Sequence, residues 1–129
     1  MLEGFTDEAR RAVVGAQELA LHHGHARAED VHLLGGVLQG DVQVSRRLRQ
    51  AGLASSAVVA SCPRARPDHR YFLGESLQRA ALRARVEATI ARDPEVTSQH
   101  LVLALLQQPA VVAAVEAAGI NTGQVRACL

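Results

Sequence analysis

The segment HLLGGVLQ, residues 32–39, returns sixty-eight residues later as HLVLALLQ, residues 100–107. A self-similar period of this length indicates two copies of one supersecondary unit. Each copy carries an apolar face that is too large to leave in water, so the two units are expected to pack against each other.

The similarity extends to both sides of this segment. Phe5 matches Phe72 and Glu8 matches Glu75 at a spacing of sixty-seven residues, and AGL at 51–53 matches AGI at 118–120 at the same spacing. Gly40 is interpreted as one inserted residue that changes the register. The sequence therefore predicts a duplicated domain.

The composition indicates a folded helical protein. The chain has 129 residues, of which 48% are hydrophobic, enough for a substantial core. It contains two Phe, one Tyr and no Trp. The core is therefore expected to consist of Leu, Val, Ile and Ala, which suits closely packed helices.

Charge and cysteine content exclude several classes of protein. Fourteen basic residues, all Arg, balance thirteen acidic residues, so the chain lacks the positive field that drives binding to nucleic acid or anionic membranes. Cys62 and Cys128 form neither a disulfide framework nor a metal pattern and are expected to be free thiols. No apolar run reaches about 18 residues and no signal peptide is recognisable, so a cytoplasmic protein is expected.

The first half predicts four helices. Thr6 is the expected N-cap of the first helix, which carries a stripe of small residues and ends near Gly24. Asp30 is the expected cap of the second, which extends to about Gln39. A third, from 42 to 51, is closed by Gly52, and a short fourth passes through 58 and 59.

The second half repeats this pattern after a break. Two prolines and two arginines predict a linker at 63–70 between a first repeat at 1–62 and a second at 71–129. A helix ended by Asp93-Pro94, a second capped near Thr97 or Ser98, a third closed by Gly119 and a short last helix then follow. No segment alternates as a strand would. The predicted fold is an all-α bundle of eight helices, formed by two four-helix repeats in one compact domain.

These residues resemble the N-terminal domain of the Clp-type AAA+ unfoldases, particularly the ClpC branch. The family's opening motif is similar to FTDEARRAVV at 5–14, and its two Thr-Glu-His motifs are similar to DVHLLGGV at 30–37 and SQHLVLAL at 98–105. The resemblance covers nearly the whole chain. It implies a pseudo-twofold bundle that binds substrate proteins, adaptor proteins or peptide ligands and passes them to an ATPase ring, without a cofactor.

The chain departs from the family at two kinds of position. A Walker A motif requires lysine, and the chain has none, so no ATP-binding P-loop and no enzyme activity are expected. In the ClpC branch the Glu of each Thr-Glu-His motif receives phosphoarginine. Those positions are Val31 and Gln99 here, and neither offers a carboxylate, although Glu29, Asp30 and Glu95 lie nearby in sequence.

The resemblance also implies where a ligand would bind. The matching surface is an apolar groove at Leu2, Phe5, Val13, Val14 and Phe72. A freestanding paralogue that acts as a decoy, a regulator or a sequestering protein is an alternative. A helical enzyme, DNA-binding protein or metal-binding protein is a more remote one.

The remaining clusters favour structural roles. His22, His23 and His25 could gather a metal but are more typical of a polar helix end. His32 and His100 occupy equivalent places and are interpreted as half-buried side chains that bond to the backbone of the preceding loop. An arginine set is interpreted as a solvated helix face plus linker rather than a nucleic-acid stripe: Arg46, Arg47, Arg49, Arg64, Arg66 and Arg70.

Overall fold

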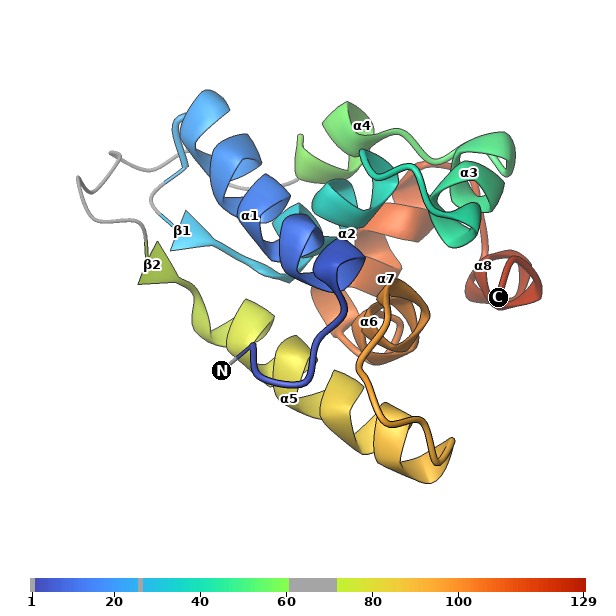
Figure 1. The fold of residues 1–129 in the computed structure, drawn as a ribbon. Helices are drawn as coiled ribbons and strands as arrows, with labels where there is room; N and C mark the ends of the chain where they lie inside the picture. The colour runs from blue at the N-terminus through green and yellow to red at the C-terminus, as the bar shows by residue number, and fades with distance from the viewer. Residues whose placement is uncertain (1, 26, 61–71) are drawn as a thin grey trace.

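The computed structural model describes residues 2–25, 27–60 and 72–129 (Figure 1). Within these residues the chain forms eight helices, so the all-α prediction is confirmed: α1 Asp7–His22, α2 Asp30–Leu38, α3 Gln43–Gln50, α4 Ser55–Val59, α5 Glu75–Ile90, α6 Ser98–Leu105, α7 Pro109–Ala117 and α8 Thr122–Ala127. The predicted linker, residues 63–70, lies outside the described residues.

Helix α1 begins and ends as the sequence predicts. The Thr6 side chain accepts a hydrogen bond from the backbone N–H of Ala9 at 3.3 Å, which confirms it as the N-cap. At the other end Gly24 has φ +69°, and the N–H of His25 donates to the carbonyl of Ala20 at 2.8 Å. This is the left-handed glycine termination expected there.

Helix α2 begins one residue earlier than predicted. Its N-cap is Glu29, and Asp30 is already the first helical residue, so the assignment of Asp30 as the cap is wrong. The N–H of Glu29 donates to Nδ1 of His32 at 2.9 Å. In α6 the N–H of Thr97 donates to Nδ1 of His100 at the same distance. A histidine at the third helical position can thus close either helix start, with an acid or a hydroxyl at the cap.

Three further helix ends show how the chain reverses. Gly52 and Gly119 have φ +107° and +82° directly after the C-caps of α3 and α7, which confirms their predicted roles. Helix α5 ends differently, because Arg92 takes the left-handed conformation with φ +57°. The reversal therefore precedes Asp93-Pro94 by one residue, and Arg92 occupies the place that Gly24 has after α1.

Short β-pairings connect the two halves, contrary to the expectation of no strand. Strand β1, Arg27–Ala28, pairs in parallel with β2, Phe72–Leu73, and Ala28 is the partner of Leu73. Phe5 forms an isolated parallel bridge with Val96. Two residues per strand are too few to produce an alternating pattern in the sequence.

These pairings correct the predicted register. A shift of sixty-eight residues turns Ala28 into Val96 and Phe5 into Leu73, so one pairing becomes the other. The same shift relates the first residues of α1 and α5 and of α2 and α6. Phe5 therefore corresponds to Leu73 and not to Phe72. Each half pairs the segment before its first helix with the loop of the other half.

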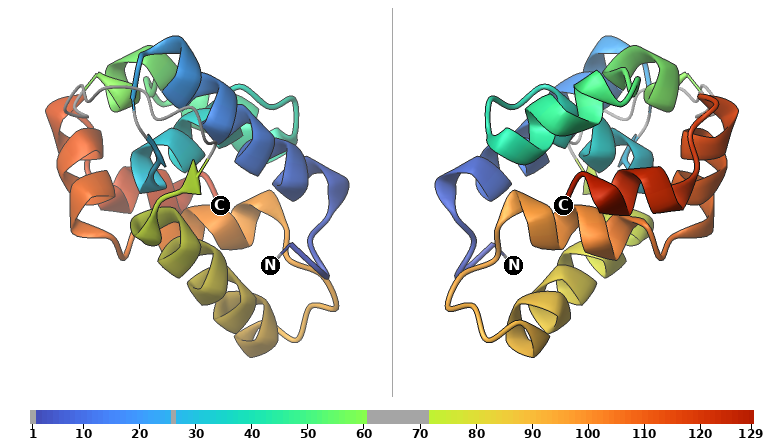
Figure 2. Two further views of the ribbon diagram at one scale, coloured as in Figure 1. Left: turned by 90° about the vertical axis from the view of Figure 1, so that its left-hand side faces the viewer. Right: turned by 90° about the vertical axis from the view of Figure 1, so that its right-hand side faces the viewer.

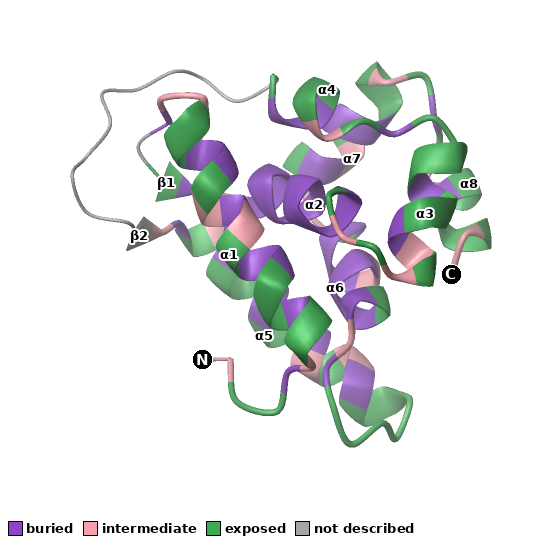
Figure 3. Ribbon diagram, turned by 45° about the horizontal axis from the view of Figure 1, so that its top comes forward, coloured by how far each residue is buried: buried purple, intermediate pink, exposed green. Residues whose placement is uncertain are grey.

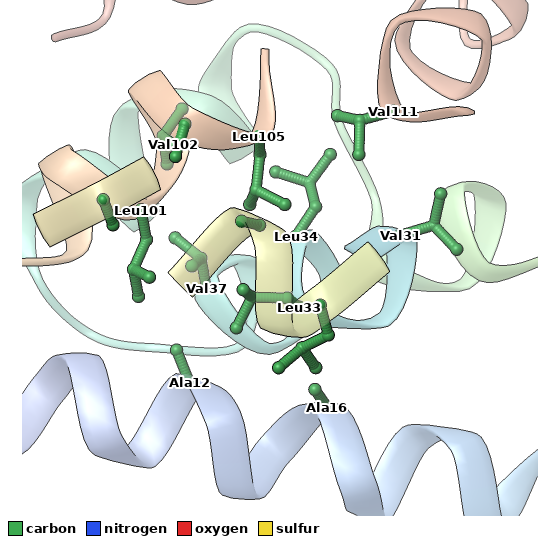
Figure 4. Close-up of a cluster of buried hydrophobic side chains, with 14 of the residues drawn as sticks. Ala12, Ala16, Val31, Leu33, Leu34, Val37, Leu101, Val102, Leu105 and Val111 are labelled. Atoms are coloured by element: carbon green, nitrogen blue, oxygen red, sulfur yellow. The ribbon is translucent and has the colours of Figure 1, made fainter. Parts of the chain in front are cut away.

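Helix α2 forms the centre of the core. All nine of its residues, Asp30–Leu38, are buried, and Figure 3 shows it enclosed by the other helices. Leu34 is 1% exposed and Leu105 of α6 is fully buried, and Figure 4 shows both in one cluster with Val111 of α7. The repeated segment is therefore the packing centre of the molecule.

A glycine allows α1 to cross α2 closely. A Cβ added to Gly36 would lie 2.1 Å from the carbonyl oxygen of Ala12, so only glycine fits between the two backbones. Figure 4 shows Ala12 and Ala16 of α1 facing α2, as expected for the stripe of small residues. The equivalent crossing of α5 and α6 has Ala80 and Ala104, both buried.

Candidate functional site

Adjoining hollows form a groove between the start of α1, the turn from α2 to α3 and the start of α6. The central hollow has a volume of about 290 Å³ and is bordered by Glu8, Arg11, Asp41, Val42 and Ser98. We use the name α1–α6 groove for this central hollow together with two neighbouring hollows that share wall residues with it. It is built across both halves of the chain, because α1 and α6 come from different repeats.

The groove extends in two directions. Glu8, Val42 and Ser98 also border a hollow of about 190 Å³ that reaches Gln99 and Leu129. On the other side, Arg11 and Asp41 border an open trough along α1. That trough reaches Val14 and Glu18. Hollows with shared walls therefore follow one another from the exposed face of α1 to Leu129.

The walls of the groove combine charge with apolar surface. Its acidic side chains are Asp7, Glu8, Glu18 and Asp41, and its basic ones are Arg10, Arg11 and Arg47. Val14, Val42, Val44 and Leu129 supply apolar contacts. Such a mixture suits a peptide, which presents backbone, charged and apolar groups together.

The predicted apolar groove does not appear as one accessible surface. Phe5 and Val13 are 3% and 2% exposed and belong to the core, and the guanidinium of Arg85 lies 5.5 Å from the centre of the Phe5 ring. Leu2 is half-buried against the same core. Val14 is 49% exposed and lines the α1–α6 groove. Phe72 is described only as backbone in β2, so its side chain lies outside the described part.

The two positions where the family carries glutamate differ sharply in exposure. Val31 is 3% exposed inside the core, whereas Gln99 is exposed and donates to the carbonyl of Leu129 at 3.2 Å. Glu95 is also exposed. Gln99 is therefore placed in the groove, while Val31 is not accessible.

Carboxylates occupy the space near Val31. The hydroxyl of Ser76 donates to Glu29, and the N–H of Asp30 donates to the same hydroxyl at 2.9 Å. A Cβ on Gly74 would clash with the Glu29 carboxylate, so Glu29 lies directly against the start of α5. Burial raises the pKa of Asp30 from its usual value.

At the equivalent contact between the start of α6 and the start of α1, the acidic and hydroxyl side chains have changed places. The shift of sixty-eight residues places Thr97 and Ser98 where Glu29 and Asp30 stand, and Glu8 where Ser76 stands. The acid is therefore on the loop at one junction and on the helix at the other. The second junction contains the hollow of about 190 Å³. Sequence reasoning missed this exchange because a spacing of sixty-seven does not align Glu8 with Ser76.

Two of the histidines, His25 and His32, form a buried hydrogen-bonded pair. Nδ1 of His32 accepts from Glu29, so Nε2 carries the ring proton and donates to Nδ1 of His25 at 2.7 Å. His32 is 1% and His100 4% exposed, so both are fully buried rather than half-buried. Burial, with added repulsion from His25 and His23, lowers the pKa of His32 to about 4.

In the second repeat an acid takes the place of the accepting histidine, His25. Nε2 of His100 lies 2.8 Å from a carboxylate oxygen of Asp93, the residue equivalent to His25. The predicted bonds from both histidines to loop backbone are confirmed. No group of three or more His, Cys, Asp or Glu side chains in residues 2–25, 27–60 and 72–129 is arranged to hold a metal ion.

The arginines of α3 have structural partners. Arg49 donates to the carbonyls of Leu38 and Gly40 at 2.5 and 2.6 Å and so satisfies the end of α2. Arg47 donates to the carbonyl of Cys128 at 3.4 Å. Arg46 lies 4.0 Å from Asp41. Arg64, Arg66 and Arg70 lie outside the described residues.

Two further expectations concern thiols and membranes. Cys128 is a free thiol, whereas Cys62 is outside the described part. No single helix in the described ranges has the length and apolar character to cross a bilayer. Only α6 and α7 taken together reach that length and composition, and they are bent by 92° to each other.

Comparison with known proteins identifies related sequences and folds. No protein-family model matches the chain. A curated relative, the chaperone protein ClpB 1 of Parasynechococcus marenigrum (strain WH8102), is 32% identical over 114 residues, which is 81% of this chain. The match spans 13% of the length of that relative.

Solved structures of Clp-type N-terminal domains share the fold. The N-terminal domain of ClpD from Arabidopsis thaliana matches with a TM-score of 0.80, 20% identity and coverage of 99% of this chain and 96% of that one. The Hsp104 N-terminal domain from Candida albicans matches with a TM-score of 0.82, 19% identity and coverage of 98% and 89%.

A third solved structure is described as a peptide from the EAEC T6SS Sci1 SciI protein. It matches with a TM-score of 0.68, 22% identity and coverage of 98% of this chain and 87% of that one. The architecture, the two equivalent helix starts and these matches agree with the resemblance in the sequence. The chain has the fold of the N-terminal domain of the Clp-type chaperones.

Proposed function

We propose that this chain is a non-catalytic domain that binds peptides or protein segments in the α1–α6 groove. The observation that carries the proposal is that the neighbouring hollows share walls from both repeats, with Val14 in the first and Gln99 in the last. Its floor includes Gly36 and Val37 of the buried helix α2, so the site is formed before any ligand arrives.

The ligands we propose are substrate proteins, adaptor proteins or peptides destined for ATP-dependent unfolding or proteolysis by a Clp ATPase ring in the cytoplasm. The ClpB relative is named a chaperone. The description of one solved structure with a similar fold names a peptide of the SciI protein. Both facts support a recognition role. A domain that binds the same ligands outside a ring would act as a decoy or a sequestering protein through the same groove.

We also propose that phosphoarginine is not the ligand. A guanidinium is held best by a carboxylate in bidentate reach. Val31 offers no acceptor and is buried, and Gln99 offers a neutral amide. Glu29 is already engaged by Ser76, which supports the view that it does not replace the missing acid.

Titration of the isotopically labelled chain with casein-derived peptides tests the groove. Amide resonances of Val14, Asp41 and Gln99 should shift together, since a bound peptide would contact both repeats. The variants Glu8→Arg and Val14→Glu should weaken binding at least fivefold, because both side chains are exposed in the groove.

The matched control is Glu116→Arg on α7, an exposed acid outside the groove. It should leave the affinity unchanged while making the same change of charge as Glu8→Arg. Equal effects of the two substitutions would show that net charge, and not the groove, governs binding.

A further inference from the structure

The first turn of α6 borders two of the hollows that make up the α1–α6 groove. Ser98, the first residue of this helix, borders both the central hollow of about 290 Å³ and the neighbouring hollow of about 190 Å³. The right-hand view of Figure 2 shows α1, α6 and the C-terminal end of the chain on one side of the molecule. A ligand in the groove therefore reaches the start of α6.

The hydroxyl of Ser98 has no hydrogen-bond partner among residues 2–25, 27–60 and 72–129. The residue itself is only 6% exposed. Every fully enclosed side-chain nitrogen or oxygen atom in that part of the chain does have a partner, so the Ser98 oxygen must reach the surface of the hollows. A nearly buried polar group that faces a hollow without a partner indicates that a ligand group binds there.

Two backbone N–H groups beside this hydroxyl are also free within the described part of the chain. The N–H groups of Ser98 and Gln99 donate to no acceptor there, whereas the N–H of Thr97 donates to His100. The first N–H groups of a helix carry partial positive charge, and α6 is eight residues long. Among the described residues, three donors at one helix start therefore lack an acceptor.

The first repeat has a carboxylate in the equivalent place. Asp30 is the residue equivalent to Ser98, and its carboxylate accepts from the N–H of Val31 at 2.8 Å. The N–H of Asp30 donates to the Ser76 hydroxyl at 2.9 Å. The fold therefore accommodates a carboxylate at this helix position, and the second repeat has Ser98 there, which supplies none.

We propose that the start of α6 binds a carboxylate of the peptide ligand, through the hydroxyl of Ser98 and the N–H groups of Ser98 and Gln99. This inference rests on the proposed peptide binding and names the ligand group that the groove selects. Two carboxylates of a peptide have this chemistry, the one at the chain terminus and the one on an Asp or Glu side chain. Either takes the place that the Asp30 carboxylate has in α2.

The charged side chains of the two hollows limit the ligand to one negative charge. Arg11 and Arg47 border these hollows together with Glu8 and Asp41, so the side-chain charges balance. The exposed carboxylate of Glu8 accepts from the backbone N–H of the ligand residue that carries the bound carboxylate. The charge of Glu8 disfavours a dianionic phosphate at the same place. The site therefore selects a carboxylate with a neighbouring donor.

Two pairs of small ligands test the proposal through amide chemical shifts of the isotopically labelled chain. N-acetyl-leucine and its amide differ only in a terminal carboxylate, and N-acetyl-aspartate α-amide and N-acetyl-asparagine amide differ only in a side-chain carboxylate. In at least one pair the carboxylate should shift the resonances of Ser98 and Gln99 and bind about tenfold more tightly than its amide. That pair identifies the source of the carboxylate. Inorganic phosphate should shift neither resonance.

Substitution of Ser98 tests the contact itself. Ser98→Asp copies Asp30 of the first repeat, so its own carboxylate should fill the site and abolish binding of the carboxylate ligand. Ser98→Ala removes the hydroxyl and should weaken that binding about tenfold. Ser56→Asp makes the same change at an exposed position of α4 outside the groove and should leave the affinity unchanged. Circular dichroism should be the same for all three variants.

Equal affinities within both pairs, carboxylate binding that survives Ser98→Asp, or an equal response to inorganic phosphate would overturn the proposal. Casein-derived peptides separate such a result from a failure of the groove. If these peptides still shift Val14 and Asp41 while neither pair shows a difference, the carboxylate site is wrong and the peptide groove stands. The small ligands thus decide the carboxylate site, and the casein-derived peptides decide the proposed function.

Discussion

Nε2 of His32 lies 2.7 Å from Nδ1 of His25, and both rings are buried. Because Nδ1 of His32 already accepts from the backbone of Glu29, a second ring proton on His32 would face a donor instead of an acceptor. The bond network therefore requires neutral His32, in agreement with its lowered pKa of about 4. One ring thus joins the end of α1 to the start of α2.

The stability of the fold should fall in acid through His32. The native pKa of about 4 lies below the unfolded value of 6.5, so the unfolded chain binds the proton more readily. The contribution is complete above pH 6.5 and is lost as pH falls toward 4. Between pH 7.5 and 5 the free energy of unfolding should drop by about 2 kcal/mol. Urea unfolding at both pH values measures this.

The matched comparison is His32→Gln, which keeps polar atoms but cannot titrate. This variant should be less stable at pH 7.5 and should lose clearly less stability on acidification than the parent chain. Buried Asp30, whose pKa is raised, remains in both proteins and cancels in the difference. An identical pH slope for the two proteins would contradict the role of His32.

Gly36→Ala should disturb the crossing of α1 and α2. The added methyl group would lie 2.1 Å from the carbonyl oxygen of Ala12, and a backbone atom cannot move aside without shifting the helix. We expect a loss of about 1–3 kcal/mol or more. Gly123→Ala in exposed α8 is the control and should cost far less, because its added methyl group would lie 3.2 Å from the exposed side chain of Asn121, which can shift, and from no backbone atom. Thermal unfolding of the two variants checks the difference.

Leu34→Ala and Leu105→Ala should each destabilise the chain by about 2–5 kcal/mol, because both side chains are buried at the packing centre. Leu82→Ala removes the same atoms from an exposed site and should change stability by no more than about 0.5 kcal/mol. Chemical denaturation at low protein concentration provides all three values. Similar losses in the three variants would contradict the assignment of the core.

Phosphoarginine at millimolar concentration should shift no amide resonance of the unmodified chain. Gln99→Glu should create measurable affinity, because this position is exposed in the groove and the substitution adds a carboxylate. Val31→Glu should create none and should destabilise the fold, since that position is 3% exposed. Free arginine and inorganic phosphate serve as control ligands. Binding by the parent chain would refute the proposed loss of this ligand.

The sequence was informative where the residue type is sufficient to define a local structure. Thr6, Gly52 and Gly119 could be assigned because hydroxyl caps and left-handed glycines have strong local preferences. Repetition of the apolar segment likewise revealed the duplication. Arg92 could not be assigned, because arginine rarely adopts the left-handed conformation that it has here.

Less of the candidate site could be predicted from the sequence. The start of α2 was misplaced by one residue because Asp is a stronger N-cap than Glu, yet the bond from Glu29 to His32 decides the position. The burial of Phe5 follows from its bridge to Val96, ninety-one residues away. No local pattern reports so distant a contact. The α1–α6 groove depends on tertiary packing in the same way.

The reciprocal pairing of Phe5 with Val96 and of Leu73 with Ala28 is the arrangement that two separate copies of a single repeat would make as an exchanged dimer. Joining such copies in one chain turns an association between molecules into an intramolecular contact. The stability of this contact then no longer depends on the protein concentration. The two halves are then free to differ at equivalent positions, as His25 differs from Asp93 and Glu29 from Thr97.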